Sequence, residues 1–370
     1  MRIDRTRPTG QILNLLRLAH DSGASDLHLI PDSVPCLRVH GRLVAANHLQ
    51  PNLEETRNLA YGIMSDRQKS RFERLREIDF SFEVEGLSRF RANVFTRRGK
   101  TAAVVRLIPL QVIPLEELGL PAVVERLAGR PHGLILVAGS SGSGKSTTLA
   151  ALIDRINRTR AKHIITIEDP IEFVHHNQMS VVSQREVPGD SPSFASALRM
   201  ALRQDPDVVL VGEMRDTETI ETTLRLAETG HLTLSTLHTR TAPDTIGRIL
   251  DMFPADQQGR IQSLLSSVLE GIVCQTLIRS RDGQGRVAAA EVLIPNPAIR
   301  NLIREHKLHQ IRSAMQTGQS GSGMRTLNQS LAELARAGRI SYEACLEVSP
   351  DTADLTRCLG RRFPNRRTPG

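Results

Sequence analysis

The stretch GSSGSGKST, residues 139–147, decides the fold expected for this chain of 370 residues. It contains the pattern GxxxxGK[ST] in full, between the apolar run LILVA and the helix-forming run TTLAALIDRI. Glycines at such a strand-to-helix turn let backbone N–H groups wrap around phosphate oxygens. Lys145 would then reach the β- and γ-phosphates, and the Ser146 hydroxyl would hold Mg²⁺. The motif therefore predicts a nucleoside triphosphate site that comprises Gly139, Ser140, Ser141, Gly142, Ser143, Gly144, Lys145, Ser146, Thr147 and Thr148.

Short apolar runs alternate with helical stretches in the last two thirds of the chain. The runs are GLILVAG, HIITIEDP, DVVLVGEM and HLTLSTLHT. Continuous apolar runs that alternate with helices predict a mainly parallel sheet with helices on its faces. Ligands of such sheets collect at the carboxyl ends of the strands. We therefore expect the chemistry of this protein in the residues that follow each run.

Acidic residues follow two of these runs. The run DVVLVGEMRD leads to Glu213, with Gly212 before it in place of the common Asp. A phosphate-loop enzyme needs a carboxylate there to polarise water or to hold the hydration shell of the metal, and a surface ion pair is the alternative. The run TIEDPIEF supplies Glu168, Asp169 and Glu172. Crowded carboxylates repel unless a cation or an arginine sits among them, which favours Mg²⁺ or attacking water here, while an acid-capped helix N-terminus is the alternative.

Two histidines, His231 and His238, lie at the two ends of the run HLTLSTLHT. Such histidines often serve as structural hydrogen-bonding groups, and their spacing alone does not assign them a function. A zinc site is not expected, because no third or fourth ligand stands nearby in the sequence.

The first third of the chain predicts a small α+β domain. Residues 11–29 begin with helical spacing and turn at Gly23 into a short strand, and strand-like alternation follows. Hairpin turns are expected near residues 85–86 and 98–99. Prolines and a change of pattern in IPLQVIPLEELGLP mark a hinge near residue 112. We therefore expect an N-terminal domain of residues 1–112 and a nucleotide-binding domain of residues 113–370, which ends in helices and a basic tail.

Composition is that of a soluble globular protein, with 39% apolar and 24% charged residues. The net charge of +8 permits binding to nucleic acid, anionic lipid or an acidic protein. Aromatic residues make up only 3%, without tryptophan, so a specific nucleic-acid surface is not expected. The four cysteines are scattered and predict reduced thiols in a cytosolic protein. No apolar run approaches the roughly 20 residues that a membrane-spanning helix needs.

A basic amphipathic helix is predicted for AIRNLIREHK, residues 298–307. Ile299, Leu302 and Ile303 fall on one face, while the charged residues of the segment, among them Arg300 and Arg304, fall largely on the other. Its pattern alone is that of an ordinary surface helix.

Four motifs together carry a family resemblance. GSSGSGKSTTLA, ITIEDPIEFVH, LVGEMRD and GHLTLSTLHT resemble the Walker A, Asp box, Walker B and His box of the secretion ATPase superfamily (the GspE/PilT family), in its order and spacing. Gly212 before Glu213 is the form that this superfamily shows. The resemblance implies an α/β fold, with a RecA-like P-loop ATPase core and a smaller N-terminal α+β, PAS-like domain. It also implies a mechanochemical motor that hydrolyses ATP with Mg²⁺.

The resemblance also implies roles for individual residues. Members of the family are ring hexamers with ATP between subunits, so a neighbour's arginines would complete each site. The candidates are Arg91 and Arg106 in the first domain with Arg203 and Arg248 in the second, and each has a surface charge as its alternative. By resemblance, Lys145, Ser146 and Thr147 would bind phosphate and Mg²⁺. Glu172 and Glu213 would bind the metal and water, with Glu213 as the general base. His231 and His238 would sense the nucleotide.

Within the superfamily the chain resembles the type IV pilus retraction ATPases over nearly its whole length. AIRNLIRE matches their retraction motif, and GRVAAAEVLIPNP before it and MQTGQSGSGMRTL after it continue the match. IRSRDGQGR stands where the assembly ATPases of pili carry a tetracysteine zinc loop, which favours retraction. The motif residues are Ala298, Ile299, Arg300, Asn301 and Leu302.

This resemblance implies a partner and a location. We expect a homo-hexamer at the inner face of the cytoplasmic membrane, held there by a PilC-like platform protein of the inner membrane, that powers twitching motility. The alternatives are a related type II/IV secretion or conjugation ATPase, a nucleic-acid translocase, and an accessory retraction subunit that binds ATP without hydrolysing it.

Overall fold

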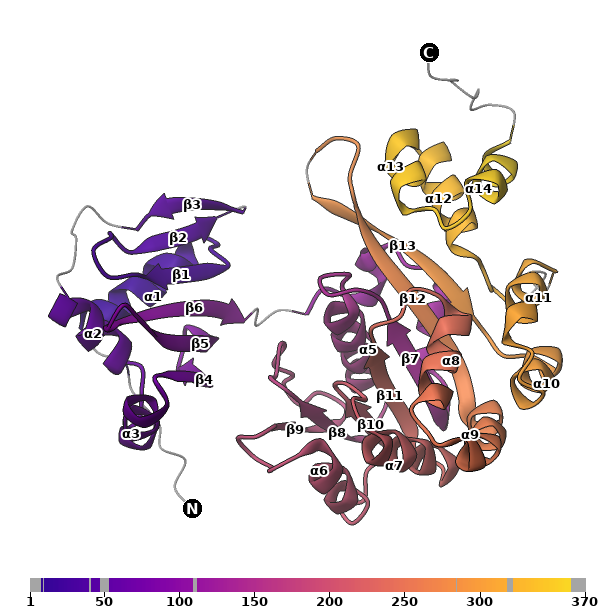
Figure 1. Cartoon of the computed structure of the whole chain (residues 1–370), viewed down its shortest axis with the longest axis horizontal. Coiled ribbons are helices and arrows are strands. Elements are labelled where there is room, and N and C mark those ends of the chain that lie inside the picture. The colour runs from indigo at the N-terminus through magenta and orange to yellow at the C-terminus, as the bar shows by residue number, and fades with distance from the viewer. Residues whose placement is uncertain are drawn as a thin grey trace. The chain divides into compact units, whose positions relative to one another are not determined.

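The computed structural model describes residues 8, 10–39, 41–46, 53–108, 112–283, 285–317 and 322–360. The chain divides into two compact units (Figure 1). The first comprises Met1–Gln111 with Glu172–Val174, and the second Val112–Ile171 with His175–Gly370. The basic stretches at the two ends of the chain, residues 1–7 and 361–370, lie outside the described residues, as does part of the run MQTGQSGSGMRTL.

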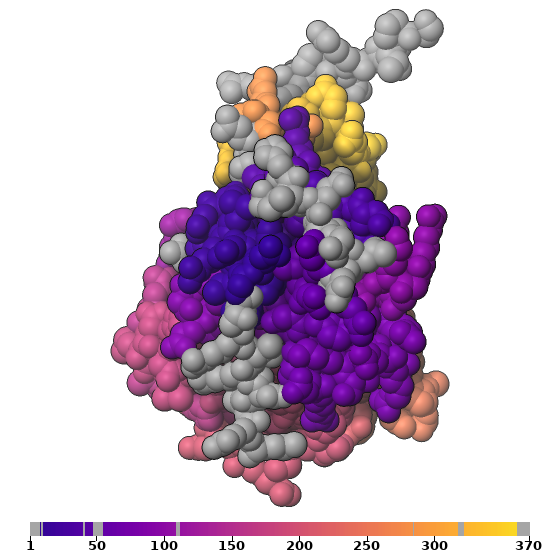
Figure 2. Space-filling model, turned by 90° about the vertical axis from the view of Figure 1, so that its left-hand side faces the viewer, coloured from indigo at the N-terminus to yellow at the C-terminus, as the bar shows by residue number. Residues whose placement is uncertain are grey.

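The first unit is built on an antiparallel sheet whose six described strands have the order β3-β2-β1-β6-β5-β4. Its core includes Leu16, Leu27 and Phe90, all fully buried. Figure 2 shows one face of this unit, coloured indigo to violet. Its elements are α1 (Gln11–Asp21), β1 (Asp26–Leu29), β2 (Cys36–Val39), β3 (Arg42–Ala45), α2 (Leu53–Tyr61), α3 (Asp66–Leu75), β4 (Glu77–Val84), β5 (Ser88–Arg97) and β6 (Lys100–Ile108).

Two tight turns join β4 to β5 and β5 to β6, where the sequence predicts them. Arg98 and Gly99 both have positive φ, 50° and 76°, so the second turn has the backbone of the hairpin type that fits the twist of the strands. Gly86 in the first turn has φ 74°. Both predicted hairpins are confirmed.

The second unit holds a sheet whose seven described strands have the order β13-β12-β7-β11-β10-β8-β9. Every neighbouring pair is parallel except β12 and β13. The four apolar runs form the central strands, as the sequence predicts. The elements are η1 (Leu115–Leu118), α4 (Ala122–Ala128), β7 (Gly133–Ala138), α5 (Lys145–Thr159), β8 (His163–Glu168), β9 (Val181–Glu186), α6 (Phe194–Ala201), β10 (Val208–Val211), α7 (Thr217–Glu228), β11 (Leu232–Leu237), α8 (Ala242–Asp251), α9 (Ala255–Val268), β12 (Leu269–Arg279) and β13 (Arg286–Leu293).

Helices cover both faces of this sheet, which explains why the strand β7 is apolar throughout. Leu134 and Leu136 pack in one core cluster with residues of α7, α8 and α9. Ile135 and Val137, between them in the sequence, pack in a second cluster with residues of α4 and α5. Because side chains of a strand alternate between the two faces of the sheet, a strand covered on both faces loses the polar half of its pattern.

Short helices follow the hairpin of β12 and β13. The expected retraction motif lies in α10, and the Asn296 side chain accepts a hydrogen bond of 2.9 Å from the backbone N–H of Ile299 at the start of this helix. Ile299 and Ile303 are fully buried, and Leu302 packs half-buried against the same core. The elements are α10 (Pro297–Arg304), η2 (Leu308–Gln310), α11 (Ile311–Thr317), α12 (Leu327–Arg336), α13 (Tyr342–Val348) and α14 (Thr352–Leu359).

None of the helices in the described part of the chain combines the length and the apolar character that crossing a membrane requires.

Candidate nucleotide-binding and hydrolysis site

The phosphate loop, defined here as residues 139–144, connects the end of β7 to the start of α5. Gly139, Gly142 and Gly144 have φ values of 149°, 75° and 92°. A residue with a side chain is strained at such positive angles, whereas glycine adopts them freely. A Cβ atom on Gly139 would also lie only 2.4 Å from the Gln275 carbonyl oxygen and 2.4 Å from Ser143 Oγ. Both the conformation and the close packing of the loop therefore require glycine.

The amino end of α5 offers donors to an anion. Gly144 is its N-cap and supplies no side-chain hydrogen bond, so the first N–H groups of the helix have no side-chain acceptor at the cap. The Lys145 Nζ donates to the carbonyl oxygens of Gly139 at 2.9 Å and Ser140 at 3.0 Å, which holds the ammonium group on the loop. The buried Ser143 Oγ has no hydrogen-bond partner within the described residues. This cradle of helix N-terminus, ammonium and hydroxyl groups fits a phosphate.

Four neighbouring parallel strands, in the order β7, β11, β10 and β8, end at one edge of the sheet. The register pairs Ala138 with Leu237, so the phosphate loop and His238 begin beside each other. Val211 pairs with Ser235 on one side and with Ile167 on the other, which brings Glu213 and Asp169 to the same edge. Residues far apart in the sequence thus line up as phosphate loop, His238, Glu213 and Asp169.

Contacts between ionisable side chains link three of these strand ends. One Glu213 oxygen, Oε1, lies 3.3 Å from His238 Nε2, and the other, Oε2, accepts a hydrogen bond of 2.9 Å from Arg215 Nε. The same guanidinium group reaches Asp169, with 3.6 Å between Nη1 and Oδ2. The Glu213 side chain is 24% exposed, against 50% for His238 and 59% for Arg215. We call Asp169, Arg215, Glu213 and His238 the charged row. Glu213 is its least exposed member and is contacted from both sides.

Gly212 occupies the position before Glu213 for a steric reason. Its backbone N–H donates a 2.8 Å hydrogen bond to the Ile167 carbonyl, and its own carbonyl accepts one of 2.6 Å from Thr236 Oγ1. A Cβ atom there would lie 3.2 Å from the Ile167 carbonyl oxygen and 3.3 Å from the Glu168 Cα. Both neighbours are backbone atoms of β8. A side chain at this position would require these atoms to give way by a few tenths of an ångström.

The sequence of this chain is similar to that of known proteins. The family described as Type II/IV secretion system protein has a model that matches residues 8–346. The chain belongs to the type II/IV secretion system protein family. It is 50% identical over 336 residues to "Type IV pilus retractation ATPase PilT" of Pseudomonas aeruginosa, an alignment that covers 91% of this chain and 97% of that protein. It is 49% identical to "Twitching motility protein" of Neisseria gonorrhoeae over 345 residues, which covers 93% of this chain and 92% of that one.

A solved structure in the family agrees with the fold. "Crystal Structure of the Pilus Retraction Motor PilT and Bound ADP" is 50% identical and superposes with a TM-score of 0.89, over 94% of this chain and all of that one. The α/β fold predicted from the sequence is confirmed, together with the resemblance to secretion ATPases. The binding of ADP in that structure agrees with a nucleotide site in this family member.

One histidine of the secretion-family His box lies away from the phosphate loop. Leu232, which follows His231, pairs with Gly133 at the start of β7, whereas the loop follows the end of that strand. Six residues of strand lie between His231 and His238, so their Cα atoms are about 23 Å apart. His231 instead contacts the end of α7 through Nδ1, at 3.0 Å from the Leu226 carbonyl oxygen and 3.1 Å from Thr229 Oγ1. His238 thus lies at the loop edge and His231 lies at the other end of the strand, and nucleotide sensing by the two histidines stays a prediction.

The four candidate arginines lie in different surroundings. In the first unit Arg91 pairs with Asp79 at 3.4 Å, and Arg106 pairs with Asp26 at 2.9 Å. Arg91 and Arg106 are register partners across β5 and β6, so they lie side by side in that sheet. In the second unit, Arg203 is exposed in the turn that leads to the amino end of β10, and Arg248 is exposed in the last turn of α8. That any of these arginines completes the nucleotide site of a neighbouring subunit stays a prediction.

The Asp-box acids of this family member separate in the structure. Asp169 joins the charged row through Arg215. Glu168 has other partners: its Oε1 accepts hydrogen bonds from Thr166 Oγ1 at 2.6 Å and from Gln184 Nε2 at 3.2 Å. Glu172 is exposed and is the first of the three residues that group with the first unit, so its metal-binding role stays a prediction.

Sequence reasoning missed two residues of the site, Arg215 and Gln275. Arg215 stands two residues after Glu213 in the quoted run, and its charge was a usable signal, because crowded acids need a cation. Gln275 lies on β12, in the run LEGIVCQTLIR that matches none of the four family motifs. A polar residue in a buried apolar strand was the only hint of it.

Mg²⁺ binding beside the phosphate loop stays a prediction, and two side chains carry the oxygen atoms that it would need. The Ser146 hydroxyl at the start of α5 and the Glu213 carboxylate are oxygen donors of the kind that Mg²⁺ prefers. Among the described residues no three His, Cys, Asp or Glu side chains form a metal-binding group.

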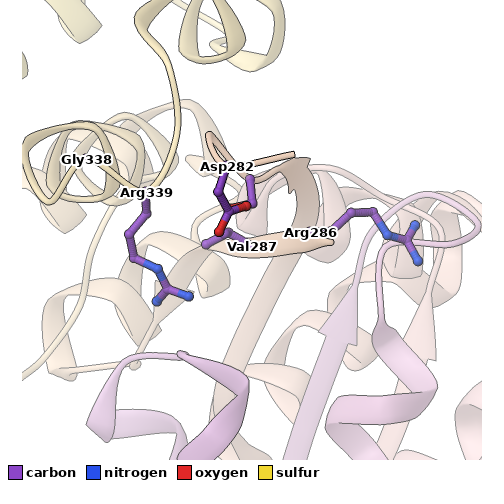
Figure 3. A pocket seen from close by; sticks show the side chains of 6 residues that line it. Asp282, Arg286, Val287, Gly338 and Arg339 are labelled. Atoms are coloured by element: carbon purple, nitrogen blue, oxygen red, sulfur yellow. The ribbon is translucent and has the colours of Figure 1, made fainter. Parts of the chain in front are cut away.

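A separate pocket of about 320 Å³ lies at the tip of the β12–β13 hairpin, against the end of α12 (Figure 3). Asp282 stands between the side chains of Arg339 and Arg286 in this view. The Arg281 backbone N–H donates a 2.9 Å hydrogen bond to the Arg339 carbonyl, which ties the hairpin to the helix end. Its residues are distinct from those of the phosphate loop and the charged row, so we do not assign it to the reaction.

Proposed function

We propose that this chain is the ATP-hydrolysing motor of type IV pilus retraction. Membership of the type II/IV secretion system protein family and two relatives at 49% and 50% identity support it. Those alignments cover at least nine tenths of this chain and of each relative, so the similarity extends over most of their length. The observation that carries the proposal is the order of groups at one sheet edge: phosphate loop, His238, Glu213 and Asp169.

This order suits the hydrolysis of a γ-phosphate. Lys145 and the N-terminus of α5 bind the phosphates and neutralise their charge. Glu213 accepts the proton of the attacking water, and His238 and Arg215 hold its carboxylate in place. Mg²⁺, when bound at Ser146, supplies charge neutralisation of the phosphate oxygens. Glu213 is half-enclosed, so its carboxylate is oriented but still accessible to water.

The proposed motor is a homo-hexamer in which neighbouring subunits share sites. An arginine supplied to the transferring phosphate is worth about 10³ to 10⁵ in rate. Arg91 and Arg106 each already bind a carboxylate within the first unit. A neighbour's nucleotide would therefore have to compete with Asp79 and Asp26 for them. Arg203 and Arg248 are exposed alternatives.

Helix α10 is the proposed link to the load. It carries no group suited to phosphate chemistry, while Ala298 and Asn301 are exposed on it. We propose that this helix transmits the motion of the ring to a PilC-like platform protein at the inner face of the cytoplasmic membrane. Asn301→Ala, on this exposed face, should then spare much of the ATPase rate while retraction in cells is lost.

Steady-state ATP hydrolysis by the purified protein tests the enzyme, and twitching of a deletion strain carrying the variants tests the motor. Lys145→Ala should lose nucleotide binding and hydrolysis together. Glu213→Gln should keep binding and lose hydrolysis by about 10² to 10⁴-fold. Full hydrolysis by a lasting monomer would contradict shared sites, and normal twitching with Glu213→Gln would contradict the motor.

An accessory role is the second candidate, because the chain is also 40% identical over 341 residues to "Type IV pilus ATPase PilU" of Pseudomonas aeruginosa. An accessory subunit would bind ATP through Lys145 and show little turnover of its own. Twitching restored by Glu213→Gln but not by Lys145→Ala would favour this candidate over the motor.

A further inference from the structure

Gln275 lies beneath the phosphate loop, although it comes from a strand outside the four motifs. Cys274 on β12 pairs with Ala138, the last residue of β7. Since β12 continues beyond this pair while β7 gives way to the loop, the next residue of β12 reaches under the loop. Gln275 is only 6% exposed, which is uncommon for a glutamine unless its amide is hydrogen-bonded.

The two ends of the Gln275 amide contact different parts of the site. Its Oε1 accepts a 2.7 Å hydrogen bond from Thr148 Oγ1, in the first turn of α5. Its Nε2 faces the loop, where a Cβ atom on Gly144 would lie 2.8 Å from it. Its backbone carbonyl oxygen leaves no room for a side chain at Gly139, the other end of the loop, since a Cβ atom there would lie 2.4 Å from it. One residue therefore supports both ends of the loop and the start of the helix.

The chemistry of this position favours a neutral amide. The acceptor end orients Thr148, three residues after Lys145 and two after Ser146. The donor end places N–H hydrogens under the loop that binds phosphates. A carboxylate of the same shape could still accept from Thr148, but it would place a negative charge in a buried position near the phosphates.

We infer that Gln275 is a positioning residue of the nucleotide site, which holds the phosphate loop and the first turn of α5 in the geometry that binds ATP. It acts through Thr148 and the loop glycines and does not touch the reacting atoms. The inference rests on the proposed function only in requiring that the loop binds a nucleotide. It makes no use of pili or of hexamer contacts.

The test compares Gln275→Glu with Gln275→Met in the full-length protein. The readouts are the Kd for ADP and ATP, the KM and kcat of hydrolysis, and the Tm. Gln275→Glu should raise Kd and KM at least tenfold with kcat changed less than threefold. Gln275→Met, which keeps the volume but loses the acceptor, should raise Kd three- to tenfold.

Thr148 provides matched controls for the hydrogen bond. Thr148→Ser keeps the hydroxyl donor and should raise Kd less than Thr148→Val does, whereas Thr148→Val should match Gln275→Met. Combining Thr148→Val with Gln275→Met should cost no more than either change alone, because both remove the same bond.

A Kd for Gln275→Glu within twofold of wild type overturns the inference. A lowered Tm in both Gln275 variants without any change in KM also overturns it, because that pattern is purely structural. If Gln275→Glu does not fold, Gln275→Met and the two Thr148 variants decide the matter by the same criteria. A wild type that binds nucleotide but supports no twitching would refute the motor and leave this comparison valid.

Discussion

Glu213 and His238 face each other across the ends of β10 and β11, with 3.3 Å between Oε1 and Nε2. They are separated by 24 residues of sequence that form α7 and β11. The contact exists because the two strands are parallel neighbours whose carboxyl ends reach the same sheet edge. In this position an imidazole can orient the carboxylate that the proposed reaction uses as its base.

The two histidines of the His box should therefore differ in function. His238→Ala should lower kcat by about tenfold or more, since its partner Glu213 loses one of two fixed contacts. His231→Ala, at the opposite edge of the sheet, should keep the kcat of wild type and cost about 1 kcal/mol of stability through lost hydrogen bonds to α7. Equal losses of kcat in the two variants would contradict this assignment.

Arg215 should be sensitive to a change that keeps its charge. Its fork contacts Glu213 through Nε and Asp169 through Nη1, which the single ammonium group of lysine cannot reproduce. Arg215→Lys should reduce kcat by about tenfold with little effect on Tm, because the exposed ion pairs contribute little stability. Arg225→Lys, which alters an exposed pair with Glu221 on α7, is the control. Unchanged kcat in Arg215→Lys would remove Arg215 from the site.

Gly212 should not tolerate a side chain. Gly212→Ala places a Cβ 3.2 Å from the Ile167 carbonyl oxygen, and relieving this contact should cost about 1–3 kcal/mol of the free energy of unfolding. Gly212→Asp should cost more. Gly259→Ala is the control, because a Cβ there meets nothing within 4 Å and alanine favours a helix by about 0.5–1 kcal/mol. Urea unfolding gives the free energy of unfolding of both alanine variants. Equal values for Gly212→Ala and Gly259→Ala would contradict the close approach of β10 to β8.

Arg300 should be an anchor of α10 and not part of its exposed face. Its Nη1 donates to the carbonyl oxygens of Ser266 at 2.6 Å and Ser267 at 2.9 Å, near the end of α9. Its Nη2 pairs with Glu270 at 3.0 Å. Arg300 is one of the charged residues expected opposite the apolar face, and its side chain is only 24% exposed.

Arg300→Ala should accordingly lower the free energy of unfolding by about 1.5–3 kcal/mol, because it removes charge-assisted hydrogen bonds and leaves their acceptors unpaired. Arg304→Ala, four residues later on the exposed side of the same helix, should change it by no more than about 0.5 kcal/mol. The comparison needs only thermal or urea unfolding. Destabilisation of the same size in both variants would contradict the anchor.

His175 should make stability depend on pH. Burial lowers its pKa to about 4, an effect that nearby Asp154 partly opposes and His176 reinforces. The ordinary histidine pKa is near 6.5, so between these two values the unfolded chain binds more protons than the folded one. Stability from this residue is therefore complete above about pH 6.5 and is lost as the pH falls towards 4, by about 3 kcal/mol in total.

The measurement is urea unfolding from pH 7 to pH 4.5 for wild type, His175→Gln and His176→Gln. His175→Gln should lose part of the pH dependence. His176→Gln should retain it, since this neighbouring side chain is exposed. Identical pH profiles of wild type and His175→Gln would contradict an uncharged His175 in the folded protein.

The sequence by itself determined the parts of this protein that depend on local chemistry. The glycines, Lys145 and Ser146 identify a phosphate loop because only glycine adopts its positive φ values and because a helix N-terminus attracts anions. The fully apolar strands indicated a parallel sheet, since both of its faces are covered. Hairpin turns at residues 85–86 and 98–99 were equally readable from their glycines.

Only the tertiary structure decided which of these residues meet. The strand order β7, β11, β10, β8 differs from the order in the sequence, and it places His238 between the loop and Glu213 while it leaves His231 at the far edge. The same packing puts Gln275 under the loop and Arg300 on α9. Contacts of this kind depend on which strands and helices become neighbours, and that is set by the packing of the whole sheet, which no local pattern records.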